Sequence, residues 1–445
     1  MLSRRPLAAA ATLAALATLA PRLASANGDN THAWISRHAV ERLPPGGLRT
    51  FLERPELQSA LLNGTVFPDG GYVVKDDYGE IAHWEPYLDA YIESIRTRYG
   101  DKLLDGAAAE EVAFLLGMAS HDMADQTFDS MFLERAMVHD AAGWSDELFD
   151  SIDTASDVIA VADTGESLDI VPKIPYDALV AVYKDPIGYE VTASVLRQGQ
   201  DLLDRLVINY GRVTGTSDPD RLAGYRVRYP WANEHLLDTT TACGPHCEAD
   251  IIAAYWQVIW DRLFDESEAQ NDLVATHPRD GAAGHPVDHT QIDAEVVLVL
   301  GFGVVRDSLA GKVTAVDDTG HSYDLAVTTW RSESNVVRIA PREDWGADRD
   351  ITVTVAAGVQ LIGREPLAAP YVLHFSTRAG DPGLPVSDPT PHVGEPAAGI
   401  AQPPAPPETG GCSVASGAGD AGAVGLALVA IALLRRRYSA SVQES

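Results

Sequence analysis

The chain has 445 residues, which is enough for two or three domains and at least one sizeable hydrophobic core. Acidic residues outnumber basic ones by 64 to 33, and the formal net charge is −31. This charge argues against a protein that coats nucleic acid, because such a surface needs clustered Lys and Arg, but it does not exclude a small phosphorylated substrate.

The first 26 residues have the order of a secretory signal peptide. Arg4 and Arg5 supply a basic start, an apolar run follows (LAAAATLAALATLA), and ASA at residues 24–26 is a small-residue cleavage site. We therefore expect export, with the mature chain starting at Asn27.

Residues 27–284 are dominated by apolar residues at helical spacing, as in AAEEVAFLLGMASHDMADQTF and EADIIAAYWQVIWDRLFDES. The first predicted helix lies in NTHAWISRHAVERL, with Asn30 or Thr31 as its N-cap and His32 on its apolar face. This region is predicted to be an all-α domain.

The stretch SHDMADQTFDS carries the strongest indication of function. In a helix over residues 112–133, His121 and Asp125 lie one turn apart on the apolar side. An unpaired carboxylate there is costly, so the two residues either pair with each other or bind a metal ion. Asp69, in a predicted turn, and His83, ahead of a predicted helix, add to a nitrogen and oxygen ligand set of the kind that zinc prefers.

Two of the three cysteines lie close together in TACGPHCEADII. Cys243 and Cys247 are expected to form a disulfide in an oxidising compartment. The alternative is a metal site that includes His246, but it lacks a second pair of ligands.

Residues 285–378 alternate between apolar and polar with a period of two, as in AEVVLVLGFG, DITVTVAAG and YVLHFST. This pattern predicts an all-β antiparallel sandwich. The closing sequence APREDWGADRDITVTVAAGVQLIGREPLAAPYVLHFST resembles the bacterial Ig-like module of surface-layer proteins. The resemblance implies a role in spacing or adhesion.

The C-terminal part is predicted to be a linker and a tail. Residues 379–411 are rich in Pro, Gly and Ala, which is typical of an extended linker. In residues 412–438, Cys412 precedes an apolar run (421–434) and a basic stop (435–437). This order resembles the sorting tail of many myxobacterial surface proteins, which implies attachment to the cell surface, with the tail either cut near Cys412 or kept as a membrane anchor.

Four short motifs of the helical region occur in a fixed order: TH, GTVFPD, AHWEPY and SHDMAD. Together they resemble the zinc-dependent phospholipase C family, and particularly the N-terminal domain of the glycosylphosphatidylinositol-specific phospholipases D. That family folds as a helical bundle around a cluster of zinc ions and hydrolyses phosphodiesters. The resemblance implies metal ligands at His32, His83, His121 and Asp125. Asp125 would bridge two ions, and Asp69 would orient or deprotonate a metal-bound water.

Two positions depart from the family pattern. Asp129 stands in place of a second histidine, and Phe149 stands about where a downstream histidine is expected. Asp129 and Asp153, with His139 from a predicted loop as an optional third donor, would then rebuild an oxygen-rich second site for zinc, calcium or magnesium. The favoured interpretation of His139 itself is an ordinary loop histidine without a metal role. Alternatively, the second site is lost and Asp129 is a solvated acid.

These patterns predict an exported, surface-anchored, metal-dependent phosphodiesterase that uses more than one zinc ion. The resemblance implies a phospholipid or another phosphodiester as substrate and the membrane as a partner through the tail, and the acidic charge argues against nucleic acid. The alternative is a non-catalytic adhesion or spacer protein with a degenerate metal site. The head group, the type of cleavage and the oligomeric state are not set by the sequence.

Overall fold

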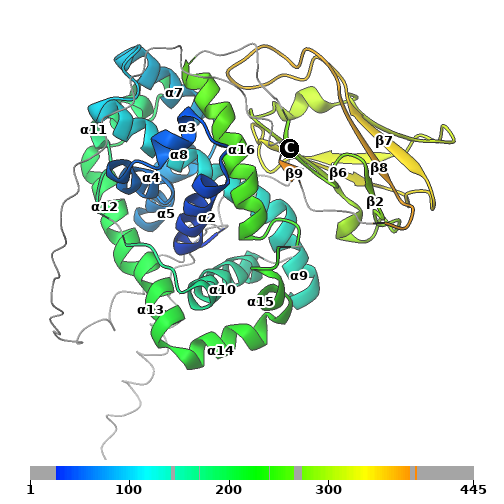
Figure 1. The fold of residues 1–445 in the computed structure, drawn as a ribbon, viewed down its shortest axis with the longest axis horizontal. Coiled ribbons are helices and arrows are strands. Elements are labelled where there is room, and N and C mark those ends of the chain that lie inside the picture. Colours follow the sequence, from blue (N-terminus) through cyan, green and yellow to red (C-terminus); the bar gives the residue numbers. More distant parts are fainter. Residues whose placement is uncertain are drawn as a thin grey trace, which may run out of the picture. The chain divides into compact units, whose positions relative to one another are not determined.

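The computed structural model describes residues 27–141, 146–169, 171–239, 241–264, 273–380 and 386–387. The predicted signal peptide, most of the linker, Cys412 and the C-terminal tail lie outside these residues. The described residues belong to one unit of the chain, Ala24–His392. A helical region is followed by a β region (Figure 1), which confirms the predicted fold class.

The helical region contains these α-helices: α2 (Asp29–Arg42), α3 (Gly47–Leu52), α4 (Gln58–Gly64), α5 (Asp69–Val74), α6 (Tyr78–Ala82), α7 (Glu85–Tyr99), α8 (Gly106–Thr127), α9 (Glu134–Ala141), α10 (Asp146–Thr164), α11 (Tyr176–Val182), α12 (Ala193–Leu203), α13 (Asn209–Ser217), α14 (Pro219–Arg228), α15 (Pro230–His235) and α16 (Pro245–Phe264). Short π-helical segments follow some of them: η2 (Phe128–Leu133), η3 (Tyr183–Ile187) and η4 (Asp204–Ile208).

Helix α8 lies at the centre of the helical region, with α2, α4, α7 and α16 packed against it (Figure 1). Helix α4 crosses it where Gly64 meets Gly117, and a Cβ on either glycine would collide with the backbone of the other helix. This close crossing brings the Thr65 carbonyl against His121, which lies one turn beyond Gly117. The packing of α4 on α8 thus positions one of the predicted ligands.

The start of α2 differs from its prediction. The helix begins at Asp29 with Gly28 as N-cap, so neither Asn30 nor Thr31 caps it. The side chains of both residues are bound instead to the Asp157 carboxylate of α10, at 2.8 Å from Asn30 Nδ2 and 3.0 Å from Thr31 Oγ1. These contacts fasten the first turn of α2 to α10.

The β region contains these strands: β1 (Leu273–His277), β2 (Ala282–Ala283), β3 (Val296–Leu300), β4 (Val313–Asp317), β5 (Leu325–Thr328), β6 (Val336–Pro341), β7 (Asp350–Val355), β8 (Tyr371–Ser376) and β9 (Val386–Ser387). One sheet has the order β5-β6-β3-β1-β9 and the other has the order β2-β8-β7-β4. β7 alternates between buried and less buried residues, whereas β3 is buried throughout, because it lies inside its sheet. β1 and β2 precede residue 285, so the strands start earlier than the alternating pattern.

Within the described part of the chain, no helix is long and apolar enough to cross a membrane. The predicted tail at residues 412–438 is not part of that search.

Candidate metal centre

His83 and His121 face each other with their Nε2 atoms 2.9 Å apart. Nδ1 of His121 lies 2.8 Å from the carbonyl oxygen of Thr65, and Nδ1 of His83 lies 2.6 Å from that of Gly79. A carbonyl oxygen only accepts hydrogen bonds, so both Nδ1 atoms donate and both Nε2 atoms are directed into the site. Histidines that bind metals commonly donate their second ring nitrogen in this way.

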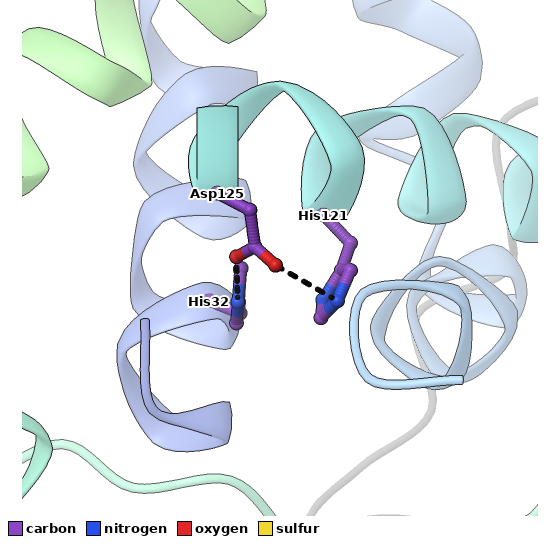
Figure 2. A group of neighbouring side chains, drawn as sticks. All are labelled: His32, His121 and Asp125. Carbon is purple, nitrogen blue, oxygen red and sulfur yellow. Dashed lines mark ion pairs between the residues drawn. The ribbon is translucent and has the colours of Figure 1, made fainter. Parts of the chain in front are cut away.

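Asp125 lies between two histidines that come from different helices (Figure 2). Its Oδ1 is 3.0 Å from Nε2 of His32 on α2, and its Oδ2 is 3.6 Å from Nε2 of His121 on α8. The rings of His32 and His121 stack with their centroids 4.1 Å apart. Since each carboxylate oxygen faces a different imidazole, Asp125 has the arrangement needed to bridge two cations.

Asp69 completes the cluster from the start of α5, in a helix rather than in the predicted turn. Its Oδ1 is 3.5 Å from Nε2 of His83 and 3.7 Å from Nε2 of His121. It is 3% exposed, and neither of its oxygens has a hydrogen-bond partner. Buried carboxylates are usually paired or bound to a metal ion, and the groups beside Asp69 are the Nε2 atoms of two candidate ligands, so Asp69 fits a metal site.

Two close groups of ligand atoms occur in the helical part of the described chain: His32, His121 and Asp125 form one, and Asp69, His83 and His121 form the other. The fold therefore brings together five predicted site residues from α2, α5, α8 and the end of α6. A third group, in the β region, is half-buried to exposed and consists of Asp288, His289 and Asp344. Because exposed acidic groups commonly occur without an ion, we draw nothing from this third group.

The two facing imidazoles have opposite pKa shifts. Burial acts against protonation of His83, but the Asp69 and Asp125 carboxylates outweigh burial and raise the pKa of His83 to about 10. Burial and the neighbouring His32 lower the pKa of His121 to about 4. At neutral pH the Nε2 atom of His83 therefore carries a proton and the Nε2 atom of His121 carries none, while both Nδ1 atoms keep theirs. A metal ion bound to both Nε2 atoms would replace that proton.

The charge of Asp125 is preserved in spite of its burial. Burial raises the pKa of this carboxyl group, but His121 and His32 outweigh burial and lower its pKa to about 2. Asp125 is therefore ionised at neutral pH and available as a ligand.

Asp29 is a candidate site residue that the sequence analysis missed. It is fully buried, and neither of its oxygens has a hydrogen-bond partner. Burial and the carboxylates of Asp69, Asp157 and Asp125 raise its pKa well above the ordinary value. Asp29 lies three residues before His32 in the same helix, so the two share one face. The spacing of three residues between Asp29 and His32 in the sequence DNTH could have identified Asp29 as a candidate.

Asp129 and Asp153 belong to neither close group of ligand atoms. Asp153 is 2% exposed, and burial, followed by the charges of Asp129 and Asp125, raises its pKa well above the ordinary value. Asp129 is half-buried in the π-helical segment η2. Both acids thus lie in the electrostatic neighbourhood of Asp125. The side chain of Phe149 lies outside the described residues, so the prediction of a second site stays open.

The remaining predicted residues have simpler roles. Cys243 and Cys247 form a disulfide in the structure, and Nδ1 of His246 lies 3.0 Å from a guanidinium nitrogen of Arg42. His139 is exposed and lies in α9 rather than in a loop, with its ring stacked on Trp231 at 4.9 Å. His139 belongs to no close group of ligand atoms among the described residues, and its part in a second site stays a prediction.

The site coincides with a match to a known family. Residues 31–128 match the family described as zinc dependent phospholipase C, and residues 268–377 match the family described as bacterial Ig-like domain. The first match contains all five clustered residues and ends just before Asp129. It supports zinc as the metal of this cluster.

Individual relatives match about a quarter of the chain. Phosphatidylinositol-glycan-specific phospholipase D of Mus musculus is 36% identical over 121 residues, which are 25% of this chain and 14% of that protein. The enzyme of that name from Bos taurus is 33% identical over 135 residues, which are 28% of this chain and 16% of that protein. The chain thus matches only a small part of the length of these relatives.

Among solved structures, the N-terminal part of the bacterial S-layer protein SbsC aligns with 65% of this chain and 77% of that chain, at 9% identity and a TM-score of 0.20. A likeness at this level carries no argument.

Proposed function

We propose that the chain is an exported, surface-anchored phosphodiesterase that hydrolyses phospholipids with a zinc-activated water. The single observation that carries the proposal is the pair of Nε2 atoms of His83 and His121, 2.9 Å apart and flanked by Asp69 and Asp125. The matched zinc dependent phospholipase C family supports the same reading. Export and anchoring rest on the signal-peptide and tail patterns alone.

The residues of the cluster have distinct roles in this proposal. Zinc would supply a bound water of near-neutral pKa and would stabilise negative charge on the phosphoryl oxygens. His83 and His121 hold their rings in place through the bonds from Nδ1 to backbone carbonyls. Asp69 has no hydrogen-bond partner of its own, so its carboxylate is free to orient the attacking water and accept its proton.

More than one ion fits the arrangement of ligands. Asp125 directs one oxygen at His32 and the other at His83 and His121, so its carboxylate could contact one ion at His32 and another at His83 and His121. Asp129 and Asp153 would add oxygen ligands for a further ion, which could be zinc, calcium or magnesium.

The second candidate is a surface adhesion or spacer protein that keeps a metal without catalysis. It is favoured by Asp129 and Phe149, which stand where the family pattern has histidines, and by the Ig-like match of residues 268–377. The two candidates differ in whether the zinc-loaded chain turns over a phosphodiester.

The test is hydrolysis of vesicles of phosphatidylcholine and of phosphatidylinositol by the zinc-loaded full chain, with separate detection of phosphorylated and unphosphorylated head group. We expect turnover by the wild type and a loss of about 100-fold or more in Asp69→Asn, with its zinc content retained. The exposed Asp101 gives the matched control Asp101→Asn, which should keep full activity. A zinc-loaded wild type that cleaves neither lipid would favour the adhesion protein.

A further inference from the structure

Two buried polar residues of the β region contact the helix that carries the metal ligands. Ser334 and Asn335 are 0% and 2% exposed, which is unusual for polar residues in a loop. The Oε1 atom of Gln126 accepts hydrogen bonds from Ser334 Oγ at 2.6 Å and from the backbone N–H of Asn335 at 2.8 Å. Gln126 directly follows Asp125 on α8, so this contact lies one residue from the candidate bridging ligand.

The same loop also contacts the segment after His83. Nδ2 of Asn335 donates to Oε2 of Glu85 at 3.2 Å. Glu85 is fully buried and accepts further hydrogen bonds from Arg262 at 2.6 Å and from the Tyr255 hydroxyl at 3.1 Å. The loop therefore braces two ligand-bearing segments, one two residues after His83 and one next to Asp125.

The regular α-helical hydrogen bonding of α8 ends shortly after Asp125. The helix changes at Phe128 to π-helical hydrogen bonding, which is rare and frequently found at functional sites. The β region also contacts this segment, because Trp330 Nε1 donates to Ser130 Oγ at 2.8 Å. The β region thus contacts the backbone segment that directly follows Asp125.

We infer that the Ig-like region positions the metal-binding end of α8 through the Gln126 contact with Ser334 and Asn335. Gln126 is a positioning residue in this account: it acts through the backbone of Asp125 and touches no ligand atom. The inference rests on the proposed metal site, and it gives the Ig-like region a role beyond spacing or adhesion.

The experiment uses cobalt(II) in place of zinc in the full chain, because the visible spectrum of bound cobalt reports the geometry of its ligands. Gln126→Leu removes the acceptor oxygen but keeps a side chain of similar size. We expect it to change the cobalt spectrum and to lower cobalt affinity roughly 10-fold or more, as for other residues that orient metal ligands. Gln126→Glu keeps an acceptor oxygen and should restore the cobalt spectrum. Ser334→Ala removes one of the two bonds and should have a smaller effect of the same kind.

The matched control is Arg338→Met, which removes the ion pair between Arg338 and Glu134. This pair also joins the β region to the helical region, but it lies farther from Asp125 along the chain. The control variant should leave the cobalt spectrum unchanged even where it lowers the melting temperature. A folded Gln126→Leu with the spectrum and affinity of the wild type would overturn the inference. If that variant does not fold, a wild-type spectrum in Ser334→Ala would overturn it instead. A wild-type chain that binds no cobalt would overturn the proposed metal site itself, and the inference with it.

Discussion

At the scale of single residues, the site combines too many buried carboxylates with too few cations. Asp29, Asp69 and Asp153 each have at least one buried oxygen without a hydrogen-bond partner. Apart from burial, the largest effects on the pKa values of Asp29 and Asp153 come from other carboxylates. Such an arrangement is costly in a metal-free chain and favourable once divalent cations are bound.

Asp29→Asn separates these two states. Because the pKa of Asp29 is raised in the metal-free fold, this residue lowers the free energy of unfolding at every pH well above the ordinary carboxyl pKa. The destabilisation is therefore present at neutral pH. We expect the metal-free variant to be more stable by about 1–2 kcal/mol in urea unfolding at neutral pH. Its zinc affinity should fall because a neighbouring negative charge is lost. Unchanged zinc affinity and a less stable metal-free variant would contradict this role, and Asp101→Asn is the control.

Metal binding should release a proton. Because the pKa of His83 is raised to about 10 without metal, its ring is protonated at neutral pH and must lose that proton to bind through Nε2. Zinc affinity should therefore rise with pH up to about pH 10. Calorimetric titrations in buffers of different ionisation enthalpy should show about one proton released at neutral pH from this residue. In His83→Gln this component should be absent, and equal release in both chains would refute the assignment.

At the scale of elements, the crossing of α4 and α8 fixes the position of His121. Gly64 and Gly117 allow the two backbones to touch, and the Thr65 carbonyl then reaches Nδ1 of His121. The apolar period predicted the helix that carries His121 and Asp125, because periodicity is a local property. It could not predict the start of α2 at Asp29, since Asn30 and Thr31 are bound by Asp157, which lies far along the chain.

Gly117→Ala tests this crossing. The added Cβ would collide with the Leu61 carbonyl oxygen, and overpacking of this kind typically costs about 1–3 kcal/mol. Gly224 gives a matched control on α14, because a Cβ there meets nothing within 4 Å. Gly224→Ala should leave stability unchanged or raise it by up to about 1 kcal/mol. Equal effects of the two substitutions on urea unfolding would show that the close crossing does not matter.

At the scale of the whole molecule, the sequence predicted a helical domain and a sandwich but not the contacts between them. The motifs around His32, Asp69, His83, His121 and Asp125 were sufficient for the cluster, because each motif is short and local. The contact between Gln126 and Ser334 was out of reach, because neither residue has a pattern of its own and they lie 208 positions apart. The sequence shows that Asp129 and Phe149 depart from the family pattern. It does not show how these two residues affect a second metal site.

These buried contacts predict cooperative unfolding. Because Glu85 and Gln126 would lose buried partners if the regions separated, we expect one calorimetric transition for the described regions together. Zinc should raise the midpoint of that whole transition. Two transitions, with only one shifted by zinc, would show that the regions are energetically independent.

The central claim is that His83 and His121 bind one zinc ion through their Nε2 atoms. Anomalous diffraction from crystals of the zinc-loaded protein, measured above and below the zinc absorption edge, locates such an ion directly. We predict a peak about 2.0–2.1 Å from both Nε2 atoms, with Asp125 as a further ligand. No zinc peak at these two histidines, in crystals that contain zinc elsewhere, would contradict the account.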